Sequence, residues 1–230
     1  MQRKSKLTFG VLALAAVAAI LVVTSVTRGA STTPAERAST PDAQQGHQGT
    51  GIDLARHEAG DPLALGRDNA PVVLVEYADF RCPFCGIFAR DTKPELMKYV
   101  QDGTVRIEWH DLPVFGQESV DAAVAGRAAA KQGRFWQFYD ATFAEAPARG
   151  HLALPRAKLV ELAGKAGVPN LSQYAADLDD PALLAQVHAD AQSAQQIGAN
   201  STPLFFVNDE PILGAQPVSV FVTAIEHAQK

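Results

Sequence analysis

Residues Val72 to Cys85 read VVLVEYADFRCPFC and decide the fold. The first part, up to Phe80, is a short β-branched apolar run, which is typical of a buried central strand. The second part carries Cys82 and Cys85, the only cysteines among the 230 residues. Two thiols separated by two residues cannot make a four-thiolate metal site or link distant segments. Their spacing therefore indicates a pair that forms and breaks one short disulfide.

Cys82 stands where the expected strand ends and a helix begins, and Pro83 suits an early helical position because no N–H is lost there. The sulfur of Cys82 should then lie near the unpaired N–H groups and the positive dipole end of the helix, which stabilise a thiolate. The dipole contributes about 0.3–1 kcal/mol, which lowers the pKa by roughly one unit. A larger shift needs direct hydrogen bonds to the sulfur. We expect Cys82 to be exposed and Cys85, inside the first turn, to be the more buried thiol.

Two further features point to the same site. Glu76 lies six residues before Cys82 in an otherwise apolar strand, and a buried carboxylate is costly unless it has a role. It could accept a proton from Cys85 through water, or it could instead lie solvated at the strand end. Thr202 and Pro203 directly precede another expected strand, and an X-Pro bond at such a place can be cis.

The order of the remaining elements predicts a fold class. A short edge strand is expected at 63–65, and a helix after the cysteines should bend at Pro94, where Thr92 and Glu95 have capping-box spacing. Further elements are expected in this order: a strand at 105–109, an Ala-rich helical block of four or five helices at about 119–198, a hairpin of 204–207 with 211–213, and a helix at 218–227. Aromatic residues of the block, from Phe135 to Phe143, are most simply core residues. This order predicts an α/β thioredoxin-like fold with a helical insertion.

The N-terminal segment 7–26 reads LTFGVLALAAVAAILVVTSV and holds no charge. A helix of this length spans about 30 Å, enough to cross a bilayer core. Three basic residues precede it, which places the N-terminus in the cytoplasm and the rest outside. The alternative is a cleaved signal peptide, but a cut after Ala30 would put Arg28 where a small residue is needed. We therefore expect residues 1–28 to form a cytoplasmic N-terminus and a transmembrane signal anchor.

Residues 29–60 are rich in Ser, Thr, Ala, Gln, Gly and Pro and hold few large apolar side chains. Such a segment cannot bury enough surface to fold, so it is expected to be a flexible linker before a domain at 61–230. His47 and His57, in or beside it, are interpreted as solvated side chains rather than metal ligands.

The net charge of −5 argues against nucleic acid as a partner, because nothing makes a basic footprint. A zinc site at the cysteine pair is disfavoured as well. The nearest histidine in the sequence, His110, lies at a strand end and has no HxxxH partner. We expect no metal and no cofactor beyond the redox-active disulfide itself.

Three stretches together resemble the DsbA-like thiol:disulfide oxidoreductases of the thioredoxin superfamily: VVLVEYADFRCPFC, GRFWQFYDATF and STPLFFVNDEPILGAQP. The resemblance covers 61–230. It implies that Cys82 is the nucleophile and Cys85 the resolving thiol. It also implies that Pro203 is cis and faces the pair with Thr202 beside it, and that Glu76 is the buried carboxylate.

The resemblance further implies a place and partners. The catalytic domain would lie outside a bacterial cell membrane, tethered by a single pass, or be secreted or periplasmic if the N-terminal segment is cleaved. Its substrates would be unfolded or reduced exported proteins. A membrane quinone-linked thiol oxidase, DsbB-like or vitamin-K-epoxide-reductase-like, would re-oxidise it.

One position departs from the best-known oxidases of the family, which have a histidine where this chain has Phe84. Phenylalanine offers no polar hydrogen to a thiolate, so a strongly oxidising potential does not follow from the resemblance. Phe84 could instead supply apolar contact to unfolded substrates. An extracytoplasmic reductase or isomerase therefore stays open beside the oxidase, and so does a non-enzymatic holdase or interaction module.

Overall fold

The computed structural model of this chain describes residues 51–230. The expected anchor at 7–26, most of the expected linker and His47 lie outside the described residues. Within 51–230, no helix combines the length and the apolar character needed to span a membrane. The packed chain begins before Asp61, because the Arg56 side chain donates to the Asp61 carboxylate at 2.8 Å and to the Trp109 carbonyl at 2.7 Å.

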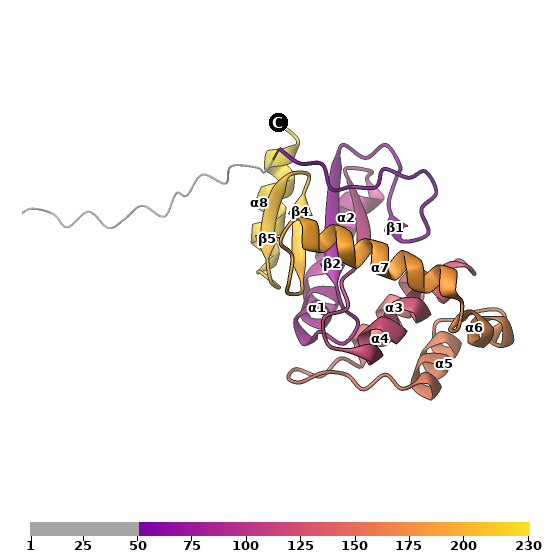
Figure 1. Cartoon of the computed structure of the whole chain (residues 1–230). Helices are drawn as coiled ribbons and strands as arrows, with labels where there is room; N and C mark the ends of the chain where they lie inside the picture. Colours follow the sequence, from indigo (N-terminus) through magenta and orange to yellow (C-terminus); the bar gives the residue numbers. More distant parts are fainter. Residues whose placement is uncertain (1–50) are drawn as a thin grey trace, which may run out of the picture. The chain divides into compact units, whose positions relative to one another are not determined.

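Five strands form one mixed sheet in the order β1-β3-β2-β4-β5 (Figure 1). Their bounds are β1 Ala64–Leu65, β2 Val72–Ala78, β3 Val105–Asp111, β4 Leu204–Val207 and β5 Glu210–Leu213. β2 pairs in parallel with β3 and antiparallel with β4. The strand that leads to the cysteines is therefore the central one, and each of its residues is buried, as expected of a strand that is covered on both faces.

Helices cover both faces of this sheet. Their bounds are α1 Pro83–Ile87, the π-helical turn η1 Phe88–Thr92, α2 Lys93–Gln101, α3 Gln117–Ala130, α4 Phe135–Ala144, α5 Arg156–Lys165, α6 Leu171–Asp177, α7 Pro181–Gln196 and α8 Val218–Ala228. On one face, Leu74 and Phe205 pack with Phe221 of α8. On the other face, Val75 packs with Ala194 of α7, which crosses the strands in Figure 1.

The helical insertion consists of α3 to α7 and lies between β3 and β4, as the sequence predicts. In Figure 1, α3 to α6 lie together to one side of the sheet, and α7 runs back from them across it. Phe80, two residues before Cys82, joins the sheet to the insertion. Its ring lies 4.7 Å from that of Trp109 on β3 and 5.4 Å from that of Phe138 on α4. The interpretation of the aromatic residues of the insertion as core is confirmed.

The break in the helix after the cysteines differs from the prediction. The sequence places it at Pro94 with a capping box, whereas the structure has the π-helical turn η1 immediately before α2. Thr92 makes no side-chain capping bond. The reason is that the helix continues through this turn, and the Lys93 N–H already donates to the Phe88 carbonyl. The Lys93 N–H therefore needs no cap from the threonine, and Pro94 has no N–H to be capped.

The polar side of β3 is buried, although nothing in the sequence indicates what covers it. Alternating apolar and polar residues favour a half-exposed strand, yet Arg106, Glu108 and His110 are all buried. Helix α7 and the segment around Arg56 cover this side. The charges are paired there, with Arg106 Nε donating to Glu108 at 2.9 Å, which is the condition under which buried charges are tolerated.

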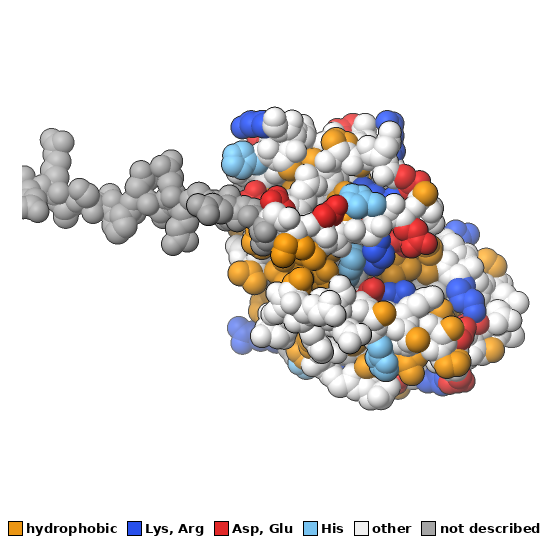
Figure 2. All heavy atoms as spheres, turned by 45° about the horizontal axis from the view of Figure 1, so that its top comes forward, with side chains coloured by type: hydrophobic (Ala, Val, Ile, Leu, Met, Phe, Trp, Pro, Cys, Tyr) orange, Lys and Arg blue, Asp and Glu red, His pale blue; other side chains and the backbone are white. Residues whose placement is uncertain are grey.

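The surface carries both signs of charge. On the face drawn in Figure 2, Lys and Arg side chains are interspersed with Asp and Glu rather than gathered by sign. Such a face does not make the basic footprint that a nucleic-acid backbone requires. The absence of a nucleic-acid partner stays a prediction.

Candidate redox site of Cys82 and Cys85

The two cysteines lie at the start of α1, with Cys82 as its N-cap and Pro83 in the first helical position. Both are thiols, and both are buried. The expectation that Cys82 is exposed is wrong, because the residue is only 1% exposed. The loop before β4 contributes to this burial: the Cys82 thiol donates to the Thr202 carbonyl at 3.3 Å. The Thr202–Pro203 peptide bond is cis, as expected.

Electrostatics separate the two thiols. The pKa of Cys82 is lowered from 9.0 to about 6, chiefly by a hydrogen bond from Cys85 and further by Thr202 and the N–H groups of Cys85 and Phe84, against the effect of burial. Burial raises the pKa of Cys85 well above 9.0, and the hydrogen bond it donates to Cys82 raises it further. These direct bonds explain why the shift at Cys82 exceeds the roughly one unit that a helix dipole supplies. At neutral pH, Cys82 is a thiolate and Cys85 is a thiol.

The Thr202 side chain is placed to donate a hydrogen bond to that thiolate. Its hydroxyl oxygen is buried and has no hydrogen-bond partner among the described residues while the thiol points at the carbonyl. Once Cys82 ionises, the sulfur becomes an acceptor, and the hydroxyl can turn to donate to it. This is the physical source of the Thr202 contribution to the lowered pKa.

Glu76 lies on β2 and is fully buried, which rules out a solvated position at the strand end. The Tyr139 hydroxyl reaches both of its carboxyl oxygens at 3.3 Å. Burial raises the pKa of Glu76 from 4.5 to about 8, the positive charge of Lys93 and the Tyr139 hydrogen bond lower it, and a Cys82 thiolate raises it. At neutral pH this carboxyl therefore holds a proton within the electrostatic range of the cysteine pair.

Two residues of this site, Lys93 and Tyr139, are absent from the prediction made from the sequence. Lys93 Nζ lies 4.6 Å from the centre of the Tyr139 ring and pairs with Asp140 at 2.6 Å. In the sequence, Tyr139 is one of several aromatic residues in an amphipathic helix, and Lys93 is one of several charges next to Pro94. Nothing in either pattern distinguishes them from a core residue and a surface lysine.

Arg81, immediately before Cys82, ties the insertion to the redox loop. Its guanidinium donates to the Phe115 carbonyl at 2.7 Å and to the Leu152 carbonyl at 2.9 Å, and it pairs with Glu118 at 3.3 Å. One rim of the site is therefore built from two loops of the insertion. Phe84, which is 58% exposed, is available on the surface of α1 for contact with a substrate.

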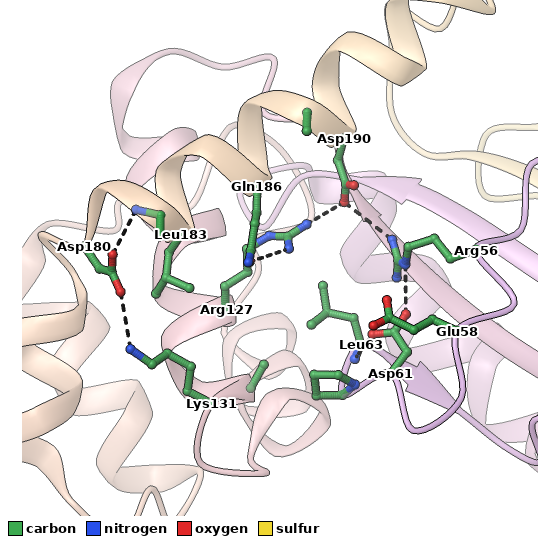
Figure 3. A pocket seen from close by; sticks show the side chains of 14 residues that line it. Arg56, Glu58, Asp61, Leu63, Arg127, Lys131, Asp180, Leu183, Gln186 and Asp190 are labelled. Carbon is green, nitrogen blue, oxygen red and sulfur yellow. Dashed lines mark hydrogen bonds and ion pairs between the residues drawn. The ribbon is translucent and has the colours of Figure 1, made fainter.

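A cavity of about 580 Å³ lies elsewhere in the described chain (Figure 3). It is lined by residues between Arg56 and Leu63 and by α3 and α7, and neither cysteine lines it. Its three cations are already paired: Arg56 with Asp61 at 2.8 Å, Arg127 with Asp190 at 2.6 Å, and Lys131 with Asp180 at 3.3 Å. In Figure 3 these pairs span the cavity walls. The pairing marks a structural junction rather than a site with charge to offer a ligand.

The two thiols have different roles in thiol–disulfide exchange. One sulfur is held as a stable thiolate, which makes it a good leaving group, while the other stays protonated beside a buried acid. This division of roles is the chemistry of thiol:disulfide oxidoreductases. The strand order, with the cysteine pair at the start of α1 after the central strand, is thioredoxin-like.

Comparison with known proteins agrees with this class. The family model described as thioredoxin matches residues 58–227. The chain belongs to this family and, within the thioredoxin superfamily, is a DsbA-like thiol:disulfide oxidoreductase.

Three individual proteins illustrate the similarity. Disulfide bond formation protein D of Bacillus subtilis (strain 168) is 30% identical over 156 residues, which are 66% of this chain and 70% of that protein. The crystal structure of oxidised BdbD from Bacillus subtilis matches with a TM-score of 0.68 at 27% identity and covers 72% of this chain and 91% of that one. The Na(+)/H(+) antiporter NhaA of Herminiimonas arsenicoxydans is 33% identical over 165 residues, which are 72% of this chain but only 25% of the antiporter.

Proposed function

We propose that this chain is an exported, membrane-tethered oxidase that forms disulfides in secreted or cell-envelope proteins through exchange at Cys82 and Cys85. The observation that carries the proposal is the difference between the thiols: the pKa of Cys82 is about 6 and that of Cys85 is well above 9.0. A stabilised Cys82 thiolate favours the reduced pair and makes the disulfide an oxidant.

The exchange would run in two steps. A substrate thiolate attacks the Cys82 sulfur of the disulfide, the bond to Cys85 breaks, and Cys85 leaves as a thiolate that takes a proton. Glu76, protonated at neutral pH, supplies that proton. A second substrate thiolate then attacks the substrate sulfur of the mixed disulfide, and Cys82 leaves as a stable thiolate. Two electrons pass from the substrate to the pair.

The lowered pKa of Cys82 predicts how oxidising the cysteine pair is. At pH 7, a thiol with a pKa of about 6 stabilises the reduced form by about 1.4 kcal/mol. For a two-electron couple this corresponds to about 30 mV. Because Phe84 adds only its backbone N–H to the sulfur, we expect a moderately oxidising pair.

Export and tethering are supported by the sequence of residues 7–26 with its preceding basic residues, and the direction of exchange by the name of the Bacillus subtilis relative. Re-oxidation is assigned to a membrane quinone-linked thiol oxidase of the DsbB-like or vitamin-K-epoxide-reductase-like kind. Such a partner would have to present a disulfide to Cys82.

The test is equilibration of the full chain with glutathione, together with the rate at which the oxidised protein introduces disulfides into a reduced, unfolded substrate. We expect a potential above that of thioredoxin, which is about −270 mV, and no oxidation by a Cys82→Ala, Cys85→Ala variant. A thioredoxin-like potential without oxidative folding, and a reduced pair in cells, would favour the reductase or isomerase. Full function of the double variant would favour the holdase.

A further inference from the structure

The geometry points to an assignment for two residues outside the cysteine motif. Tyr139 of α4 and Lys93 of α2 are positioning residues that hold the Glu76 carboxyl ready to exchange a proton with Cys85. The inference rests on the proposed thiol–disulfide exchange and extends it, because it makes the helical insertion part of the proton chemistry rather than only a cover over the redox site.

The first support is the contact between Tyr139 and Glu76. The hydroxyl lies 3.3 Å from both carboxyl oxygens and is fully buried with them. The ring is held in place by its neighbours, 4.7 Å from Phe143 and 5.5 Å from Trp109. A phenol fixed in this way can donate to either oxygen, so it follows the carboxyl whichever oxygen carries the proton.

The second support is the placement of Lys93. Its side chain is only 8% exposed and lies against the aromatic pair, 4.6 Å from the Tyr139 ring and 5.5 Å from the Trp136 ring. Its ammonium pairs with the more exposed Asp140 at 2.6 Å. A buried ammonium needs such partners, and its positive charge favours the ionised form of Glu76.

The third support is that the other groups around Glu76 cannot substitute for these two. On the strands paired with β2, Glu76 lies beside Trp109 and Phe205, which do not titrate. The start of α1 supplies Cys82 and Cys85, whose thiolates oppose ionisation of Glu76. Among the described residues, the groups that favour the carboxylate are Tyr139 and Lys93.

The consequence is a proton exchanger near neutral pH. When Cys85 leaves as a thiolate, Glu76 gives it a proton and becomes a carboxylate that Tyr139 and Lys93 stabilise. When Cys85 must attack to release a mixed disulfide, the carboxylate takes that proton back. Burial alone would keep Glu76 protonated and useless as a base, whereas the two positioning residues return its pKa to about 8.

The test uses the full chain loaded with glutathione on Cys82, so that only the attack of Cys85 is observed. The rate of glutathione release is followed from pH 6 to pH 10 in single-turnover experiments. The wild-type rate should rise with ionisation of Glu76, with a midpoint near pH 8. In Tyr139→Phe and Lys93→Met the midpoint should move to higher pH, and the rate at pH 7 should fall about tenfold for each unit of displacement.

Two matched variants separate positioning from packing. Tyr174→Phe removes another buried hydroxyl of the insertion, which donates to the Leu159 carbonyl at 3.3 Å, and it should keep the wild-type midpoint even if it lowers stability. Lys93→Arg keeps the charge and should restore the midpoint that Lys93→Met displaces.

Superimposable pH profiles for Tyr139→Phe, Lys93→Met and wild type would overturn the inference. Because glutathione release does not depend on which protein is the substrate, this outcome is distinct from a failure of the oxidase proposal. A chain that shows the displaced midpoints but oxidises no unfolded protein would retain the positioning roles and lose the proposed direction.

Discussion

Individual hydrogen bonds to the sulfur set the acidity of Cys82. Among their donors, the Thr202 hydroxyl is the group that a substitution can remove most cleanly. We predict that Thr202→Val raises the pKa of Cys82 by about one unit, because hydrogen bonds to charged groups contribute about 1.5–3 kcal/mol. The pKa is measured from the ultraviolet absorbance of the thiolate.

Thr223→Val, at an exposed position on α8, serves as the matched control and should leave the titration unchanged. If Thr202→Val titrates like the wild type, the backbone N–H groups and Cys85 alone account for the acidity of Cys82.

Glu76 should leave a signature in the pH dependence of stability. Its folded pKa of about 8 lies above its ordinary value of 4.5, so the folded state binds more protons than the unfolded state between these values. Stability is therefore lost as pH rises from about 4.5 to 8. Glu76→Gln should remove this loss and be more stable than the wild type at pH 8, by at most about 5 kcal/mol.

Urea unfolding at several pH values measures the difference, and Glu226→Gln on the exposed side of α8 is the control. Cys82 titrates in the same window in all three proteins, so comparison with the wild type isolates the carboxyl. A pH-independent difference between Glu76→Gln and wild type would show that Glu76 is ionised when folded.

Among the individual residues of the redox site, the sequence predicts those whose spacing in the chain defines the thiol chemistry. Cys82, Cys85 and Pro83 are read directly from the motif, and Glu76 from a charge in an apolar strand. Tyr139 and Lys93 cannot be found in this way, because they join Glu76 only through the packing of α4 and α2. The burial of Cys82 was missed for the same reason, since part of its cover comes from a loop 120 residues away.

Between elements, α3 lies very close to the aromatic side chains beneath it at Gly126. A Cβ at this position would lie 2.8 Å from the Phe80 ring and 3.2 Å from the Phe135 ring, in the aromatic cluster that joins the sheet to the insertion. We predict that Gly126→Ala destabilises the protein by about 1–3 kcal/mol, as overpacking does in a filled core.

Gly164→Ala on α5 is the matched control, because the nearest atom to its Cβ would be Leu171 Cδ1 at 3.8 Å. It should be neutral or stabilising by about 0.5–1 kcal/mol, since alanine favours a helix interior. Equal effects of the two substitutions in chemical denaturation would mean that α3 can move away from Phe80.

Elements with strong local patterns were predicted to within a few residues, including the central strand, the hairpin and the two ends of the helical insertion, for which four or five helices were expected. The buried polar side of β3 was not predicted. Alternation shows which side chains share a face, but it does not show that α7 and Arg56 will cover the polar face and neutralise it. Hydrogen bonds across 50 to 80 residues leave no local trace in the sequence; examples are the backbone N–H of Arg56, which donates to the Glu108 carboxylate, and that of Asp111, which donates to the Asp190 carboxylate.

For the whole molecule, we predict that the full chain sediments with membranes and stays there after extraction at alkaline pH, because residues 7–26 are long and apolar enough to span a bilayer. A variant without residues 2–28 should be released into the supernatant. A mature N-terminus after Ala30 in the wild-type protein would contradict the anchor and indicate a cleaved signal peptide.

The π-helical turn η1 sets how far α2 is rotated about the helix axis relative to α1. Each residue added to or removed from a helix rotates everything beyond it by about 100°, and a π turn accommodates one extra residue without breaking the rod. If the same residues formed an ordinary α-helix in place of η1, everything beyond the turn would rotate by about 100°, and Lys93 would swing away from Tyr139. The cysteine motif would stay intact, yet the buried acid behind it would lose its counter-charge, so conservation of the motif alone would not preserve the proton chemistry.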